Sequence, residues 1–279
     1  MSIRQIATLL HDPDGAKDAL NYAIAAARRW NAHLHVLCAG VDETEPGFYY
    51  AGAHAIDVQM NFKRTREIAL ELETRTRAFL ETEDVVWDVT SVTTAVHGLQ
   101  SLISDHMRFS DLAVLPLPYG PACGRVDVAA FEACLFGADI PVIVVPSAAS
   151  APVDPDRVLI AWDDSSEALA AARAATPFID AAKLTEICVI DPPADALDRS
   201  DPGGRLARLL ARSGAKIEVT VTARTHPSIS NQLLRHATET DADLLVMGGY
   251  GHSRLREAVL GGVTRSILAE AHLPVLMAR

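Results

Sequence analysis

The sequence predicts an α/β protein built from two similar halves, each a five-stranded parallel sheet flanked by helices. Short apolar runs alternate with segments of helical period along the 279 residues, a pattern typical of parallel strands joined by crossover helices. The same landmarks recur at nearly constant offsets. Apolar residues make up 49% of the chain but aromatic ones only 5%, so we expect cores of Ala, Val, Leu and Ile, which favours helices packed on sheets.

Two pairs of landmarks define the repeat. Asp111 begins one short apolar run, and Asp243 begins another 132 residues later. Pro141 stands in a second apolar run, and Pro274 stands in its counterpart 133 residues later. Because the two offsets are nearly equal, we interpret the halves as copies of one structural unit.

The first half carries extra residues. Its segment 5–12 resembles 157–164 at an offset of 152 rather than 132, so about 20 residues must be inserted in the first half, and we expect them at 41–60. A stretch rich in Pro, Ser and Ala separates the halves and is typical of a linker. The expected domains are therefore 1–147 and 156–279.

The second half alternates strands with helices. Its expected strands are short apolar runs bounded by turn residues, and its expected helices carry apolar residues at helical spacing. The strands are predicted at 157–162, 184–190, 216–222, 243–247 and 273–277, and the helices at 166–175, 204–212, 229–240 and 263–271.

The first half repeats this order with longer helices. Its most evident helix is a charged amphipathic run. Ligands of such sheets bind at the carboxyl ends of the strands, near the point where the strand order reverses. The strands are predicted at 6–10, 33–38, 85–92, 112–115 and 141–145, and the amphipathic helix at 61–81.

Composition disfavours several classes of function. Lys and Arg number 25 against 36 Asp and Glu, a net charge of −11, which disfavours binding to nucleic acid or to an anionic membrane. The 4 cysteines lack the paired spacing of a zinc site, so we expect them to be buried thiols in a reducing cytosol. Without a signal pattern or an apolar stretch of bilayer length, we expect a soluble, cytoplasmic protein.

Two histidines raise the question of a metal site. His33 and His35 alternate along one expected strand and therefore lie on one face of it. No third ligand is evident in the sequence, and a zinc site needs at least three. We interpret both as polar edge or packing residues, and no metal ligand is predicted.

Common catalytic signatures are missing. The sequence has no Gly-Lys pair for a P-loop, no Gly-x-Ser-x-Gly turn and no His-Glu-x-x-His. The run from Gly249 begins like a dinucleotide-binding fingerprint, but Arg254 stands where its third glycine belongs. No catalytic residue is predicted.

A glycine-rich segment in the second half carries the strongest functional signal. Gly248, Gly249 and Gly251 follow an expected strand, where they allow positive φ and a close approach to a ligand. Gly261 and Gly262 precede a helix, whose N-terminal amides and dipole favour a phosphate. The glycines could also form only a tight loop, but their spacing favours a phosphate site.

Polar residues follow the first strand of the second half. Asp163 could cap the next helix, as Asp and Ser commonly do, or it could bind a ligand. We expect Asp164 or Ser165 to provide the cap, which leaves Asp163 for the ligand.

With these glycines the chain resembles the universal stress proteins, whose nucleotide-binding members carry Gly-x2-Gly-x9-Gly followed by Ser or Thr. Gly248, Gly251 and Gly261 fit this spacing. Gly262 stands at the hydroxyl position, and Thr264 matches a nearby hydroxyl of the family. The resemblance covers both halves and implies two tandem Rossmann-like domains of the adenine-nucleotide-hydrolase type.

The resemblance also implies a binding site in the second half. Asp163 would contact the ribose or adenine end of a nucleotide, Val189 would recognise the adenine edge through its backbone, and Met247 would pack on the base. The remaining residues would line the base pocket or surround the phosphates. The implied set is Ala161, Trp162, Asp163, Val189, Met247, Gly248, Gly249, Tyr250, Gly251, Gly261, Gly262, Val263 and Thr264.

The first half departs from this pattern. His11 stands in place of the acid, and the first glycine cluster is replaced by a run with Pro116 and Pro118, which lack amide donors. The later segment 131–137 offers a single glycine. We expect this half to have lost the site and to act as a structural partner or to bind a different ligand.

The implied function is that of a stress-response protein that binds an adenine nucleotide, ATP or else AMP or ADP, with Mg²⁺ as its expected companion. Regulation is favoured over catalysis because no pair of base and water-positioning residues stands out. The alternatives are a slow ATP hydrolase and a nucleotide-free interaction module. Family members commonly dimerise through the last strand, which implies an intramolecular pseudo-dimer through 141–145 and 274–277, with a homodimer as a further expectation.

Overall fold

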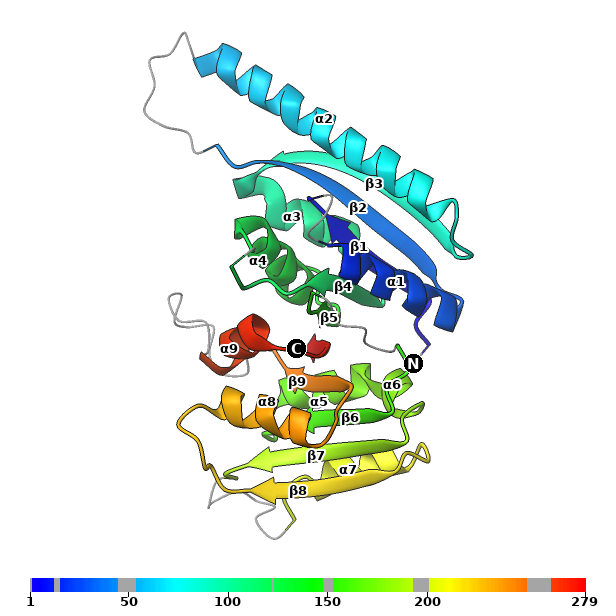
Figure 1. Ribbon diagram of the computed structural model, residues 1–279, viewed down its shortest axis with the longest axis vertical. Helices are drawn as coiled ribbons and strands as arrows, with labels where there is room; N and C mark the ends of the chain where they lie inside the picture. Colours follow the sequence, from blue (N-terminus) through cyan, green and yellow to red (C-terminus); the bar gives the residue numbers. More distant parts are fainter. Residues whose placement is uncertain are drawn as a thin grey trace. The chain divides into compact units, whose positions relative to one another are not determined.

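Figure 1 shows the fold in a computed structural model of the chain. The structure describes residues 2–12, 16–44, 54–121, 123–147, 153–192, 201–249 and 262–279, with the backbone alone at 54–58. Contacts divide the chain into two compact units. The first unit is Ile3–Ala138, and the second contains Asp139–Arg279.

The first unit is a parallel sheet in the order β3-β2-β1-β4, flanked by helices (Figure 1). The strand order reverses between β1 and β4. These two strands are neighbours, and from β1 the chain adds β2 and β3 on the side away from β4. Its elements are β1 (Gln5–Leu10), α1 (Lys17–Trp30), β2 (His33–Asp42), α2 (His54–Leu80), β3 (Val86–Ala95), α3 (Val96–Met107), β4 (Leu112–Pro116) and α4 (Arg125–Glu132), which continues as a π-helical turn (Ala133–Gly137).

The second unit has the strand order β5-β10-β9-β6-β7-β8, with β5 antiparallel to β10 and all other pairs parallel. Here the order reverses between β6 and β9. Its elements are β5 (Val142–Val145), β6 (Arg157–Ala161), α5 (Ser166–Ala174), α6 (Thr176–Ile179), β7 (Leu184–Ile190), α7 (Gly204–Ala211), β8 (Ile217–Thr222), α8 (Ile229–Glu239), β9 (Leu244–Gly248), α9 (Gly262–Glu270) and β10 (Val275–Ala278).

The α/β fold class is confirmed, and the strands and helices expected in the second half lie within two residues of their predicted ends. In the first half β2 and β3 continue further than expected, to Asp42 and Ala95, and α2 begins earlier, at His54. The long β2 and β3 pair with each other over all ten of their residues. This extended pair supports the long α2, which contacts both strands.

Strand β5 differs from the expectation of five parallel strands in each half. It forms an antiparallel pair with β10, in which Val144 lies opposite Val275 and Val142 opposite Met277. For this reason the compact units divide between Ala138 and Asp139, before β5. The expected pairing of these two strands is confirmed, while the pseudo-dimer stays a prediction.

The two aspartates that marked the repeat have the same structural role. Asp111 Oδ2 accepts hydrogen bonds from the amides of Arg4 and Gln5, at 2.8 and 3.0 Å. Asp243 Oδ2 accepts one from the amide of Arg157, at 2.9 Å. Each carboxylate therefore binds the amino end of the first strand of its unit, which is why the residue recurs at that place.

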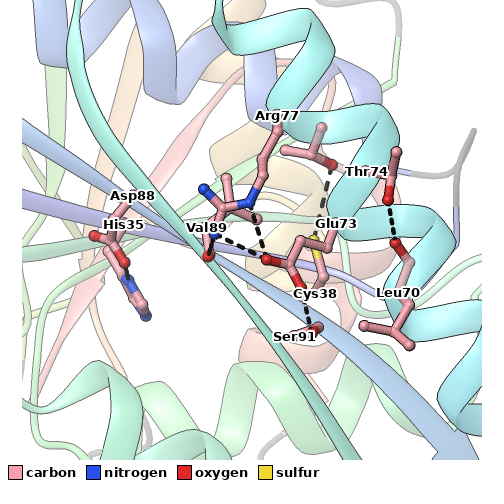
Figure 2. A network of polar contacts seen from close by, with 10 residues as sticks. His35, Cys38, Leu70, Glu73, Thr74, Arg77, Asp88, Val89 and Ser91 are labelled. Carbon is pink, nitrogen blue, oxygen red and sulfur yellow. Dashed lines mark hydrogen bonds and ion pairs between the residues drawn. The ribbon is translucent and has the colours of Figure 1, made fainter.

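Helix α2 is held on the sheet by polar contacts with β3 (Figure 2). Glu73 accepts hydrogen bonds from the Ser91 hydroxyl and, at 2.9 Å, from Arg77 Nε, while Arg77 Nη2 donates to the Val89 carbonyl at 2.5 Å. The helix has 27 residues but is charged along its length. No helix in the described ranges is both long and apolar enough to span a membrane.

The cysteines behave largely as expected. All four are free thiols; Cys38, Cys134 and Cys188 are buried, and Cys123 is half-buried. Cys38 lies under α2, where burial raises the pKa of its thiol to about 11. These buried side chains act as small apolar core residues.

The histidines of β2 share one carboxylate of β3. His35 Nδ1 lies 2.8 Å from Asp88 Oδ2, and His33 Nε2 lies 3.5 Å from Asp88 Oδ1. The ring of His106 stacks on that of His35 at a centroid distance of 6.2 Å. Among the side chains described here, no group of three His, Cys, Asp or Glu residues could hold a metal ion.

Candidate functional site

The carboxyl ends of β6, β7 and β9 lie side by side in the second unit, at the point where the strand order reverses. Ala161 at the end of β6 pairs with Met247 of β9 and with Cys188 of β7, the residue before Val189. The Trp162 amide donates to the Cys188 carbonyl at 2.9 Å. Because the strands are parallel and in this order, they bring together the four residues expected to line a base pocket.

Asp163 is an exposed carboxylate at this edge, and one of its oxygens is held in place. Its Oδ1 accepts hydrogen bonds from the amide and the hydroxyl of Ser165, at 3.1 and 2.5 Å. Its Oδ2 has no hydrogen-bond partner in the described part of the chain. Oδ2 is therefore available to a ligand that donates hydrogen bonds.

Ser165 is the N-cap of α5, where Asp164 or Ser165 was expected. Its Oγ accepts a hydrogen bond from the Ala168 amide at 3.1 Å. Asp164, between the carboxylate and the cap, has a left-handed backbone with φ of 63°. This turn leaves Asp163 outside the helix while Ser165 satisfies the helix terminus.

Gly248 ends β9 beside the N-terminus of α5. A Cβ atom at this position would lie 2.6 Å from the Ala168 nitrogen and 2.8 Å from the Glu167 carbonyl carbon, closer than real Cβ contacts. Its φ lies outside the left-handed range, contrary to the expectation of a positive-φ turn. The close approach of a helix, rather than backbone conformation, explains the glycine at this position.

The other glycines of the motif have different surroundings. The Gly249 amide donates to the Ala278 carbonyl of β10 at 2.9 Å, so this amide is used within the sheet. Gly262 begins α9, and an added Cβ there would meet nothing within 4 Å. Tyr250, Gly251 and Gly261 lie outside the described residues.

The first turn of α9 contains the hydroxyl residue Thr264, which is only 7% exposed. Val263 beside it is 38% exposed. A helix N-terminus with a hydroxyl in its first turn has the chemistry of an anion site, because its free amides and dipole also favour negative charge.

The corresponding edge of the first unit holds an ion pair instead. His11 follows β1 as Asp163 follows β6, and its Nε2 lies 2.7 Å from Asp127 Oδ1. Asp127 belongs to the first turn of α4, and its Oδ2 accepts from the Gly124 amide at 2.7 Å. The N-terminus of α4 therefore already binds a carboxylate of its own chain.

The pKa of Asp127 agrees with its contacts to His11 and Gly124. Burial alone would raise the pKa of Asp127, but hydrogen bonds from His11 and from the Gly124 amide outweigh it and hold the pKa below its usual value. The sequence analysis missed Asp127 as a partner of His11. Its signal was the spacing of Gly124 and Asp127, which is that of a capping box in which the carboxylate reaches back to the cap amide.

A shallow hollow of about 400 Å³ lies at the opposite edge of the second sheet, at the amino ends of β6, β7 and β8. Charged side chains line it, among them Lys183 and Asp156, which pair with each other at 2.6 Å. Ligands of parallel sheets bind at the carboxyl ends of the strands. The carboxyl edge, with Thr264 in the first turn of α9 and Asp163 hydrogen-bonded through only one of its oxygens, is the better candidate for a binding site.

Comparison with known proteins agrees with this fold. The sequence profile of the universal stress protein family matches residues 155–279, the second unit from just before β6. The second unit therefore carries a domain of the universal stress protein family. A universal stress protein of Synechocystis is 33% identical over 76 residues, which is 27% of this chain and 25% of that protein. The alignment thus spans about a quarter of the relative's length.

Solved structures extend the likeness in fold to the first unit. One from Archaeoglobus fulgidus, also a universal stress protein, has a TM-score of 0.70 at 16% identity and is matched over 98% of both chains. A functionally unknown protein from Pseudomonas aeruginosa has a TM-score of 0.59 at 16% identity, over 99% of this chain and 92% of that one. At these identities the likeness establishes the fold.

Proposed function

We propose that this protein binds one adenine nucleotide, with ATP as the preferred form, at the carboxyl edge of its second unit, and that it acts as a regulatory protein rather than as an enzyme. The observation that carries the proposal is the Thr264 hydroxyl in the first turn of α9, on a residue that is only 7% exposed. Together with the helix dipole it offers donors to an anionic group.

The other end of the site is an acceptor. Among the described residues Asp163 Oδ2 has no hydrogen-bond partner, while Ser165 occupies Oδ1. A nucleotide has the matching polarity, since its phosphates accept and its ribose hydroxyls donate. Between the two ends, buried Trp162, Val189 and Met247 provide apolar surface for a base.

The first unit is expected to bind no nucleotide. The amide and dipole at the N-terminus of α4 already interact with Asp127, and His11 Nε2 lies 2.7 Å from that carboxylate. A phosphate at this place would have to displace Asp127 and meet its negative charge. The proposal is therefore one nucleotide per chain.

Calorimetric titration of the full chain with Mg-ATP tests the proposal. We expect one site per chain, and Asp163→Ala should weaken binding at least about tenfold, since a charge-assisted hydrogen bond contributes about 1.5–3 kcal/mol. Asp164→Asn is the matched control, because Asn tolerates the left-handed backbone at that position. His11→Ala should leave the affinity nearly unchanged. Two equivalent sites, or a larger loss from His11→Ala than from Asp163→Ala, would contradict the assignment.

Two further measurements separate the alternatives. Acid extraction of the purified protein, followed by mass spectrometry, identifies any nucleotide that co-purifies. Saturation at a hundredfold excess over Kd should stabilise the fold by about 2.7 kcal/mol, which raises the melting temperature by roughly 5–11 °C. If no nucleotide co-purifies and the melting temperature does not shift, a nucleotide-free interaction module is favoured. Steady release of phosphate would favour a slow hydrolase.

A further inference from the structure

We propose that the histidines of β2 and α3 form a pH-sensitive contact, which holds α3 on the sheet of the first unit at neutral pH and loosens it in mildly acidic solution. The contact consists of His35 on β2, Asp88 on β3 and His106 near the end of α3. His35 and Asp88 are directly paired in the parallel sheet, so their side chains lie on the same face (Figure 2). The inference is independent of the nucleotide site in the second unit.

Hydrogen bonding fixes the position of the proton on the neutral His35 ring. An ionised carboxylate only accepts hydrogen bonds, so His35 Nδ1 donates to Asp88 Oδ2, 2.8 Å away. A neutral imidazole has one N–H group, which leaves Nε2 without a hydrogen. Nε2 is buried and has no hydrogen-bond partner among the described residues. A second proton on this ring would therefore bury an N–H group without an acceptor, which is unfavourable.

The stacked ring of His106 adds a second reason for neutrality. It lies nearly parallel to the ring of His35, at an angle of 5° and a centroid distance of 6.2 Å. Two imidazolium ions at this distance inside a protein repel each other. Burial and then the charge of His35 lower the pKa of His106, and the charge of Asp105 opposes the shift. The packed arrangement therefore favours uncharged rings.

The nearby carboxylates cannot balance all of the histidines. His33 Nε2 lies 3.5 Å from Asp88 Oδ1, so the single carboxylate of Asp88 faces two imidazoles. Asp105 is 68% exposed and lies 3.5 Å from Arg108, which leaves it little effect on His106. When the rings of β2 and α3 are all protonated, the cluster has an excess of positive charge.

The other elements that pack against the cluster were considered in the same way. β1, the neighbour of β2 on the side away from β3, has no titratable residue. α4 and its π-helical continuation pack on α3. Their charged or titratable residues are Arg125, Asp127, Glu132 and Cys134. Of these, Asp127 is already paired with His11, at 2.7 Å.

The pH dependence has a defined sign. A histidine in an unfolded chain has a pKa of about 6.5. Because the folded-state pKa of His106 is lowered, its contribution to stability is complete above about pH 6.5 and is lost as the pH falls toward the folded-state value. Since α3 also packs on α4, the loosening should extend to the helix that carries Asp127.

Hydrogen–deuterium exchange of the full chain, followed by mass spectrometry of the peptide 96–107, tests the proposal. After correction for intrinsic exchange rates, the protection of this peptide in the wild type should fall at least about fivefold between about pH 7.5 and about pH 5.5. His106→Phe keeps a ring that cannot gain a proton, and the fall should shrink to about twofold or less. His106→Gln also lacks a titratable group and gives the same readout if the phenylalanine variant does not fold.

His97→Phe is the matched control. His97 is an exposed histidine in the first turn of the same helix, so its replacement should leave the full fall in protection. Asp88→Asn should enlarge the fall, because protonated His35 then lacks its counter-charge.

Three outcomes would overturn the inference. The first is a wild-type protection that does not change with pH. The second is a fall that persists in both His106→Phe and His106→Gln. The third is a fall that His97→Phe reduces as much as His106→Phe does, since the response would then not belong to the stacked pair.

Discussion

Breaking the ion pair between His11 and Asp127 should destabilise the first unit measurably. The two atoms lie 2.7 Å apart, and the side chains are only 23% and 10% exposed, so solvent screens the pair weakly. A hydrogen bond to a charged group contributes about 1.5–3 kcal/mol. We expect His11→Ala to cost about that much. Asp127→Ala should cost more, by about 1 kcal/mol, because it also removes the acceptor of the Gly124 amide.

The effect should depend on pH in a defined direction. The pKa of Asp127 is held below its usual value by His11 and the Gly124 amide, despite burial. A carboxylate with a lowered folded-state pKa contributes stability above its unfolded pKa of about 3.9, and loses it as the pH falls through the folded value. The difference between wild type and Asp127→Ala should therefore be full at pH 7 and shrink below about pH 4.

Tryptophan fluorescence can isolate the first unit. The chain has 3 tryptophans; Trp30 and Trp87 lie in the first unit and Trp162 in the second. In a Trp162→Phe background, thermal unfolding followed by fluorescence reports only on the first unit. At roughly 4 °C for each kcal/mol, His11→Ala should lower the midpoint by roughly 6–12 °C.

A double-mutant cycle provides the decisive comparison. His11→Ala combined with Asp127→Ala should show a coupling of about 1.5 kcal/mol or more between the two residues. His97→Ala, at an exposed histidine of α3, is the control and should change stability by less than about 0.5 kcal/mol. A coupling below about 0.5 kcal/mol would refute the reasoning that Asp127 fills the anion position of the first unit through its pair with His11.

Three further results are expected. Glu73→Gln should lower the melting temperature at pH 7 by roughly 2–4 °C, for a loss of about 1 kcal/mol. Since the hydrogen bond from Ser91 lowers the pKa of Glu73, the difference in melting temperature between wild type and variant should vanish at acid pH, in melts recorded from pH 7 to 3. In native protein a thiol reagent followed by peptide mapping should label Cys123 first, and rapid labelling of Cys38, whose pKa burial raises to about 11, would contradict the buried site. Gly203→Ala should cost about 1 kcal/mol or more in thermal melts, because its φ is 82°, and an unchanged midpoint would count against that backbone conformation.

The sequence predicted the elements of the second unit well for a physical reason. Parallel strands buried on both faces are continuous apolar runs, so β7 at 184–190 stands out from its charged neighbours. Recurrence of Asp111 and Asp243 was equally informative, because each binds the amino end of a first strand. Such features are local or repeat along the chain, and a single sequence contains them.

Features that depend on long-range contacts were not predictable in the same way. Gly248 was predicted to allow positive φ near a ligand, whereas helix α5, which begins 82 residues earlier, explains it. The amide of Gly249 bonds to Ala278, the end of a strand beyond α9. His11 was recognised as a departure from the pattern, but its partner Asp127 lies 116 residues away. No periodicity reports such pairs.

The pairing of β5 with β10 has a consequence for synthesis of the chain. Val144 pairs with Val275, which follows it by 131 residues. At about 5–20 residues per second, the ribosome needs roughly 7–26 s to make that length. Helices α5 and α7 and the β6-β7-β8 ladder can form during this interval, but the antiparallel pair that joins the two ends of the second unit cannot. During translation the apolar strand β5 therefore has an edge that its partner β10 does not yet cover. A chaperone that binds nascent apolar strands could bind at this edge.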